Sequence, residues 1–97
     1  MPALTYRPEA RIDLKATYRY VAEFNPAAAE QLIRTIDEKA RLLAVSPLLG
    51  VSTDELAHNL RRFPIGHYTL FYRATDDGIE VIRVLHGARD IESLFSG

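Results

Sequence analysis

The residues of this 97-residue chain with the clearest chemical potential are cations and imidazoles that lie beyond residue 60. These cations and imidazoles are surrounded in the sequence by apolar residues. They are Arg61, Arg62, Arg73, Arg83, Arg89, His67 and His86. An arginine presents a planar, permanently charged fork that pairs with carboxylates or phosphates, and an imidazole exchanges a proton near neutral pH. This set of side chains fits either recognition of an acidic partner or cleavage of a phosphodiester.

Cleavage of RNA without a metal needs a base for the 2′-hydroxyl, an acid for the leaving oxygen and cations on the phosphorane. His86 as base, with Arg62 and Arg89 as cations, is the ribonuclease hypothesis. The competing interpretation of His86 is a structural hydrogen-bonding group at the end of a strand. The three histidines lack the spacing of metal ligands, and no phosphate-binding loop or nucleophile motif is present, so no metal or cofactor is predicted.

Composition restricts the function further. Twelve Lys and Arg against thirteen Asp and Glu give a net charge of −1, so no overall field attracts nucleic acid, and no direct nucleic-acid binding is expected from this chain alone. Cysteine is absent, which excludes disulfides and thiolate metal sites. No apolar run approaches a membrane span and no secretion signal begins the chain, so we expect one cytoplasmic domain over residues 1–97 that does not bind membranes.

The first half of the chain predicts a strand and two helices. Residues 3–6 are β-prone and lie between prolines, and Pro8 suits the first turn of a helix of about four turns. Asn25 is placed to cap a second helix that has Pro26 at its first position and ends at Ser46-Pro47. A short link between two amphipathic helices predicts an antiparallel helical hairpin. Residues 48–54 are predicted to form a loop.

The second half predicts a sheet. Strands are expected at about residues 59–63, 67–74 and 79–87, with a type I′ turn at Asp77-Gly78 between the last two. The central strand is apolar on both faces, which favours cover by the helices on one side. The predicted fold class is α+β, with the N-terminal strand and the helical hairpin packed on a small antiparallel sheet, followed by a short C-terminal tail.

Each arginine has a structural role as an alternative to a functional one. Of the neighbours Arg61 and Arg62, the one that faces the helices is expected to pair with an acidic residue, because an unpaired buried cation is costly. Arg73 is expected to pair with the Asp76-Asp77 turn. Arg83 is either in a buried ion pair or in contact with a partner, and Arg89 either organises the tail or is presented to a target. Leu94 and Phe95 either fold back over the sheet or meet a partner.

The motifs Ser46-Pro47 with Gly50, LRRF at 60–63, Tyr72-Arg73 and above all RVLHGARD at 83–90 closely resemble ParE-type toxins of the RelE/ParE superfamily. The resemblance spans residues 3–95. It implies a RelE/ParE-like fold and the toxin of a type II toxin–antitoxin pair, bound and neutralised in a hetero-oligomer by a ParD-like antitoxin. It also implies DNA gyrase as the target.

RelE-type relatives cleave mRNA on the ribosome, and the resemblance indicates where their groups would lie. Phe95 stands where those enzymes have a tyrosine, Thr69 where they have an arginine, and Leu60 with Arg62 where they have lysines. We therefore expect a non-enzymatic gyrase inhibitor; the candidate residues for target or antitoxin binding are Arg61, Arg62, Arg83, His86, Arg89, Leu94 and Phe95. The alternatives are a RelE-type mRNA interferase that uses Arg62, His86 and Arg89, and a module that mainly completes a repressor with its antitoxin.

Overall fold

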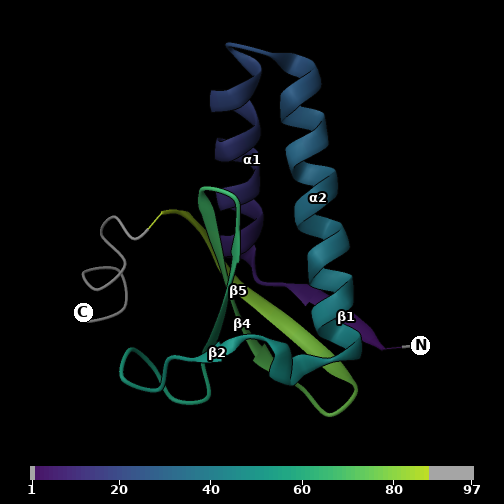
Figure 1. Cartoon of the computed structure of the whole chain (residues 1–97), viewed down its shortest axis with the longest axis vertical. Helices are drawn as coiled ribbons and strands as arrows, with labels where there is room; N and C mark the ends of the chain where they lie inside the picture. Colours follow the sequence, from purple (N-terminus) through teal and green to yellow (C-terminus); the bar gives the residue numbers. More distant parts are fainter. Residues whose placement is uncertain (1, 88–97) are drawn as a thin grey trace.

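The computed structural model describes residues 2–87 and shows two helices packed on one face of a five-stranded sheet (Figure 1). The elements are β1 (Ala3–Tyr6), α1 (Pro8–Ala22), α2 (Pro26–Val45), the 3-10 turn η1 (Pro47–Leu49), β2 (Val51–Ser52), β3 (Arg61–Ile65), β4 (Tyr68–Ala74) and β5 (Gly78–His86). The predicted α+β class and the helical hairpin are confirmed.

The helices begin where the sequence places their start signals. Pro8 and Pro26 occupy the first turns of α1 and α2, where a missing N–H is tolerated, and the Asn25 side chain accepts a hydrogen bond from Ala28 N at 3.1 Å. Because the link is so short, α1 and α2 run side by side, and their linked ends extend beyond the sheet (Figure 1). Within residues 2–87, neither helix combines the length and the apolar content needed to cross a bilayer.

The sheet is mixed rather than wholly antiparallel, which corrects the sequence prediction. Its order is β1-β5-β4-β3-β2, and β1 runs parallel to β5 while the other neighbours are antiparallel. The two parallel strands come from opposite ends of the described chain. No tight turn joins them, so nothing local imposes an antiparallel direction.

The β4–β5 hairpin is present, but the predicted type I′ turn at Asp77-Gly78 is wrong. Neither residue has a positive φ, and Gly78 is already the first residue of β5. Glycine is required at this position for another reason: a Cβ on Gly78 would collide with the backbone of Ala3, its partner on β1. The glycine therefore serves the long-range parallel pairing and not the local turn.

The segment predicted as a loop at 48–54 contains η1 and the short strand β2. Tyr72 of β4 organises it, because its buried hydroxyl donates to Pro47 O at 2.6 Å and accepts from Gly50 N at 2.8 Å. The strand expected from residue 59 begins only at Arg61, since Asn59 adopts a positive φ of 58°. Asn is one of the few residues other than glycine that tolerates this conformation.

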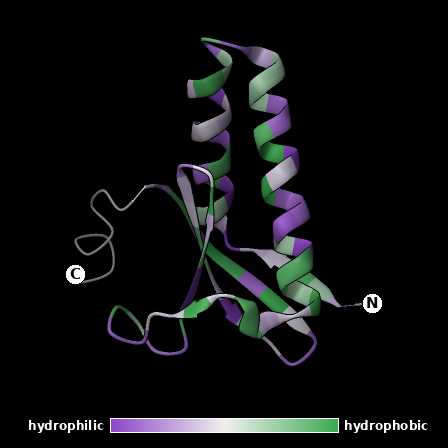
Figure 2. Ribbon diagram, viewed as in Figure 1, coloured by the Kyte–Doolittle hydropathy of each residue, from purple (hydrophilic) through white to green (hydrophobic). Residues whose placement is uncertain are grey.

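Apolar side chains pack on both faces of the sheet. The larger cluster lies under the helices and includes Ile36, Leu43, Leu70, Tyr72 and Val81. A second cluster on the opposite face consists of Leu60, Phe71, Ile82 and Leu85, with Leu56 and Ala57 packed against it. Figure 2 shows the apolar strands crossing the middle of the molecule. We call the two surfaces of the sheet the helix face and the second face.

Candidate functional site

Arg61 and Arg62 lie on opposite faces of β3, as adjacent strand residues must. Arg61 pairs in register with Tyr72 and so points to the helix face, where its Nη1 donates to Gly50 O at 2.7 Å. The predicted acidic partner of the inward arginine is therefore wrong. A backbone carbonyl in the η1–β2 segment satisfies the guanidinium without the desolvation of a second charge. Arg62 is exposed on the second face.

Arg73 does not pair with the Asp76-Asp77 turn, contrary to the prediction. Its Nε donates to His58 O at 3.0 Å, while the Asp77 carboxylate accepts from the Thr75 hydroxyl at 3.3 Å. The segment that precedes β3 brings a backbone carbonyl to the side of β4. Proximity in sequence to two carboxylates was thus a poor guide to the partner of this arginine.

Arg83 forms the ion pair that the sequence left open against a partner contact. Its Nε and Nη2 donate to the two carboxylate oxygens of Asp13 on α1 at 2.7 and 2.9 Å. Asp13 Oδ2 also accepts from Val84 N at 3.0 Å. The hydrogen bonds to Asp13 are the main reason that the pKa of Arg83 is raised. Only 24% of the Arg83 side chain and 12% of the Asp13 side chain are exposed, so this arginine has a structural role in joining α1 to β5.

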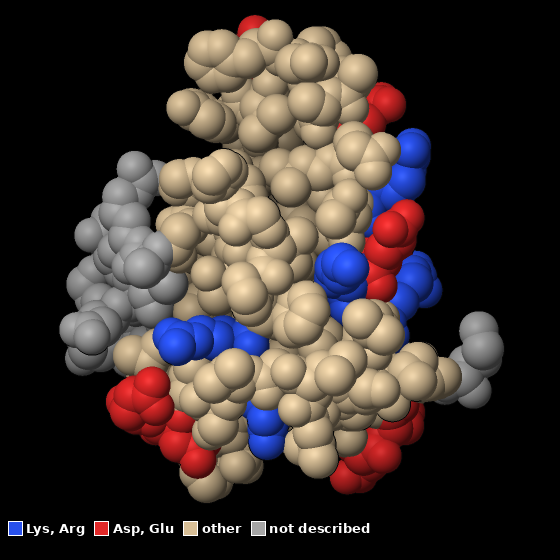
Figure 3. Space-filling view, viewed as in Figure 1, with Lys and Arg blue, Asp and Glu red and all other residues tan. Residues whose placement is uncertain are grey.

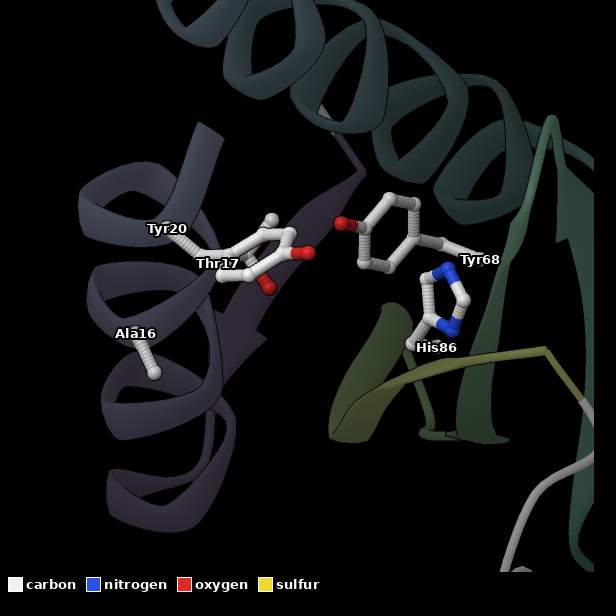
Figure 4. A pocket seen from close by; sticks show the side chains of 5 residues that line it. All are labelled: Ala16, Thr17, Tyr20, Tyr68 and His86. Atoms are coloured by element: carbon white, nitrogen blue, oxygen red, sulfur yellow. The ribbon is translucent and has the colours of Figure 1, made fainter. Parts of the chain in front are cut away.

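His86 lies on the helix face, opposite Tyr68 of β4. The rings of Tyr68 and His86 meet edge to face with centroids 5.1 Å apart, and the His67 ring is 6.3 Å from that of His86. Tyr20 on α1 approaches from the other side, and Figure 4 shows the phenols of Tyr20 and Tyr68 directed toward one another. Both the phenols and His86 line a space of about 260 Å³.

We call this space and its neighbour the inner cleft. The neighbouring part has a volume of about 500 Å³ and lies between the linked ends of the helices and the β3–β4 turn; Tyr68 and His86 line both parts. The other lining residues are Ala16, Thr17, Val21, Ala28, Gln31, Leu32, Thr35, Ile65, Gly66 and His67. The cleft is thus formed by elements from both halves of the sequence.

The described lining of the inner cleft carries no Lys, Arg, Asp or Glu. In Figure 3 much of the upper half of the face is free of these residues, whereas charged side chains gather on its right side and in its lower part. Burial, and then the neighbouring Tyr20, raise the pKa of Tyr68, so its phenol stays protonated at neutral pH. Within the described part of the chain, the cleft offers phenols, hydroxyls, an amide and the imidazoles of His67 and His86, but no Lys or Arg for a phosphate.

The two described members of the ribonuclease set are not brought together. Arg62 lies opposite Phe71 and His86 lies opposite Tyr68, and these two β4 residues are three positions apart. An odd separation along a strand places side chains on opposite faces, so Arg62 and His86 lie on opposite faces of the sheet. Arg89, Leu94 and Phe95 lie outside the described residues. No three His, Cys, Asp or Glu residues within 2–87 could share a metal ion.

A second surface lies between the helices, and none of its residues is among the candidates chosen from the sequence. We call it the outer groove; its floor is formed by Leu14, Tyr18 and Ile33, and its charged residues are Arg11, Lys15, Arg19, Arg34, Glu30 and Asp37. The larger part has a volume of about 650 Å³. The signal was in the sequence: Arg11, Lys15 and Arg19 recur every four residues, which aligns them along one side of a helix.

The Tyr6 hydroxyl donates to Asp37 Oδ1 at 3.0 Å at one end of this groove. Arg41 Nε binds the other oxygen of the same carboxylate at 2.8 Å. Burial and the hydrogen bond to Asp37 raise the pKa of Tyr6 well above its usual value. Because these two bonds occupy Asp37, the charges of the groove without an ion pair among the described residues are mostly basic: Arg11, Lys15, Arg19 and Arg34 against Glu30.

Comparison with known proteins gives the family. The family model "ParE toxin of type II toxin-antitoxin system, parDE" matches residues 4–91. No curated protein matches. A solved structure titled "Chromosomal ParDE TA system from P. aeruginosa" is similar in fold, with a TM-score of 0.74 and 21% identity over 90% of this chain and 97% of that one.

The toxin–antitoxin complex RelB-RelE from Methanococcus jannaschii contains a chain that is also similar. Its TM-score is 0.58, with 23% identity over 94% of this chain and 98% of that one. At these identities the two structures establish the likeness of fold alone. The family match covers nearly the whole described chain, and it agrees with the RVLHGARD motif and with the helical hairpin on its mixed sheet. The chain belongs to the ParE toxin family of type II toxin–antitoxin systems.

Proposed function

We propose that this toxin acts on DNA gyrase by binding it rather than by catalysis, and that a ParD-like antitoxin neutralises the toxin. Membership of the ParE family and a similar solved structure from a ParDE system support the assignment. The single observation that favours binding over RNA cleavage is the placement of Arg62 and His86 on opposite faces of the sheet.

The reason lies in the charge that develops during RNA cleavage. A phosphorane needs cations close to the atom that loses or gains a proton, and such electrostatic stabilisation is usually the largest contribution to the rate. His86 opens into a cleft whose described lining contains no Lys or Arg, and Arg83 is held by Asp13. A proton acceptor without a neighbouring permanent cation is poorly suited to phosphodiester chemistry. An mRNA interferase remains the alternative that the experiment must separate.

The outer groove supports an antitoxin partner. Its apolar floor between two helices and its basic side chains match an amphipathic helix that buries one face and presents acidic residues at its edge. A segment that folds only on binding could form such a helix and wrap around a small toxin. Under this proposal the antitoxin contacts Leu14, Tyr18 and Ile33 through apolar side chains and Arg11, Lys15 and Arg34 through carboxylates.

Two assays on the purified full chain test the proposal together. We expect inhibition of gyrase-catalysed supercoiling of plasmid DNA and no cleavage of mRNA on programmed ribosomes. Prior mixing with the cognate antitoxin should abolish the inhibition, which serves as the control for specificity. Codon-dependent mRNA cleavage with unaffected gyrase would refute the assignment and favour the interferase.

A further inference from the structure

A further apolar surface, separate from the inner cleft and the outer groove, lies at the C-terminal end of α2. Five large apolar residues within ten positions are exposed: Leu42 by 44%, Val45 by 66%, Leu48 by 75%, Leu49 by 52% and Val51 by 58%. We call them the α2-end patch. Leu42 and Val45 are three residues apart, so they lie on one side of α2, and η1 packs against this helix. Figure 2 shows the apolar colouring at this end of α2 and on η1.

The patch borders a free edge of the sheet. Of the strands formed by the described residues, β2 is the last in the order, and its other side faces no strand. Thr53 N donates to Leu60 O at 2.8 Å, so the backbone N–H of Thr53 points toward the β3 side of the segment. Alternate residues of an antiparallel pair direct their backbone groups inward and outward. The N–H and C=O of Ser52 therefore point away from the sheet.

We propose that the α2-end patch and the β2 edge form a homodimer interface, with the two-fold axis beside Ser52. Two antiparallel β2 strands paired about this residue exchange two hydrogen bonds, Ser52 N–H to Ser52 C=O in each direction. The same rotation sets Val45, Leu48 and Leu49 of one copy against the equivalent residues of the other. The two sheets then form one continuous sheet with β2 at its centre.

A second copy is the occupant that the local chemistry fits best. In an isologous interface a residue on the axis meets its own copy, so a charged residue there would be repelled. The residue at the axis here is a neutral serine, its neighbour Val51 is apolar, and the chain has a net charge of only −1. The five apolar side chains supply the centre of a contact in which each partner contributes about 800 Å², with polar residues at the rim.

The α2-end patch also differs from the surface proposed for the antitoxin. The outer groove is bordered by basic side chains suited to a partner that carries carboxylates. The five members of the patch are all aliphatic, and the hollow that Leu48 and Ser52 line carries one charge of each sign, Asp54 and Arg61, so it does not favour an acidic peptide. A two-residue strand alone would pair weakly, because short edge strands are one way in which proteins prevent association. The adjoining apolar side chains supply the affinity that the short strand lacks.

Sedimentation of the full chain over a range of concentrations tests the interface. We expect a monomer–dimer equilibrium that Leu48→Glu shifts to monomer, raising the dimer dissociation constant at least about tenfold, because two carboxylates would meet apolar surface. Phe24→Glu is the matched control, since Phe24 is also 75% exposed but lies in the link between the helices. It should leave the dimer intact.

A cross-link locates the axis. The chain has no cysteine, so Ser52→Cys introduces a single thiol. Residues in a hydrogen-bonded antiparallel pair have Cα atoms about 5.5 Å apart, within the range that a disulfide spans. Mild oxidation should give a covalent dimer of Ser52→Cys in high yield. Ala27→Cys, an exposed position at the start of α2, should remain largely uncross-linked.

Three results would overturn the interface. The first is a chain that is monomeric at every concentration. If the Leu48→Glu variant of such a monomer also loses affinity for the antitoxin, the patch belongs to the antitoxin interface. The second is a dimer broken by Phe24→Glu and not by Leu48→Glu. The third is equal cross-linking of the Ser52→Cys and Ala27→Cys variants. None of these measurements depends on gyrase inhibition, so their failure is distinguishable from failure of the proposed function.

Discussion

Asp13 of α1 continues the edge of the sheet where β1 ends, and Arg83 of β5 holds it there. Arg7 N, just after β1, donates to Val81 O at 2.9 Å, and beyond this point the Asp13 carboxylate accepts from Val84 N. Nε and Nη2 of Arg83 donate to the two carboxylate oxygens of Asp13. Ile82 is an additional residue in β5, because adjacent Phe71 and Tyr72 pair with Arg83 and Val81. The bulge thus coincides with the change from a strand partner to a side-chain partner.

Removal of this carboxylate should destabilise the fold. Asp13→Ala leaves a largely buried guanidinium and a strand N–H without their partner, so we expect the free energy of unfolding to fall by about 2 kcal/mol. Asp13→Asn should cost less, since it can still accept from Val84 N. Urea denaturation of the three proteins measures the difference. Arg41→Ala, which breaks the exposed pair with Asp37, should leave the midpoint nearly unchanged, and an equal loss in that control would contradict the special role of Asp13.

The hydroxyl of Tyr72 should be essential for the η1–β2 segment. Tyr72→Phe removes one acceptor and one donor from a buried site, and we expect a loss of about 2 kcal/mol in unfolding free energy. Hydrogen exchange should accelerate at Gly50, whose N–H binds this hydroxyl. Gly50→Ala should also destabilise, because a Cβ would collide with the Tyr72 ring and Arg62 O. Unchanged exchange at Gly50 in Tyr72→Phe would argue against this anchoring role.

Stability should decline in alkaline solution partly through Tyr6. Its pKa is raised above the ordinary 10.0, mainly by burial and then by Asp37, so the folded state holds the proton more tightly than the unfolded chain. The stabilisation from the neutral hydroxyl is therefore complete below about pH 10 and is lost as the pH rises toward the raised pKa. The unfolding free energy of the wild type relative to that of Tyr6→Phe should be constant below about pH 9 and should fall progressively as the pH rises above about 10. Parallel curves would show that Tyr6 does not titrate differently on folding.

The outer groove should respond to reversal of charge. Arg34→Glu places a carboxylate where the proposed antitoxin presents its own, so we expect the dissociation constant to rise at least about tenfold at low salt and less at high salt. Calorimetric titration with the antitoxin measures it. Lys39→Glu makes the same change at an exposed position on α2 that does not line the groove, and should have little effect. Equal effects of the two variants would point to general electrostatics instead of a docked helix.

His86 should be dispensable for proton transfer. Growth arrest on induced expression should be unaffected by His86→Gln, which keeps a polar side chain of similar reach but cannot titrate. A general acid or base contributes about 10²- to 10⁴-fold to a rate, so a catalytic histidine would make the variant harmless. Comparable expression of both proteins, checked by immunoblot, is the control. A harmless but well-expressed His86→Gln variant would favour the interferase if the wild type also cleaves mRNA on ribosomes; without such cleavage it would assign His86 to the contact with the target.

Features that depend on neighbours a few residues apart could be predicted from the amino-acid sequence. Pro8, Asn25 and Pro26 fixed where the helices begin, because capping is satisfied within one turn. The short link fixed the hairpin, and the motif at 83–90 indicated the family. The order of strand, two helices and sheet followed from hydrophobic periodicity. Each of these signals acts over distances that the chain itself enforces.

Contacts between residues far apart in the chain could be identified only from the three-dimensional packing. Asp13 and Arg83 are 70 positions apart, and the partner of Arg61 proved to be a carbonyl in a segment that read as loop. The opposite faces of Arg62 and His86 follow from the register of three strands. Gly78 is constrained by β1, which lies at the other end of the chain. Register and long-range pairing are set by the packing of the whole molecule, because shifting a strand by one residue exchanges its faces without altering any local preference.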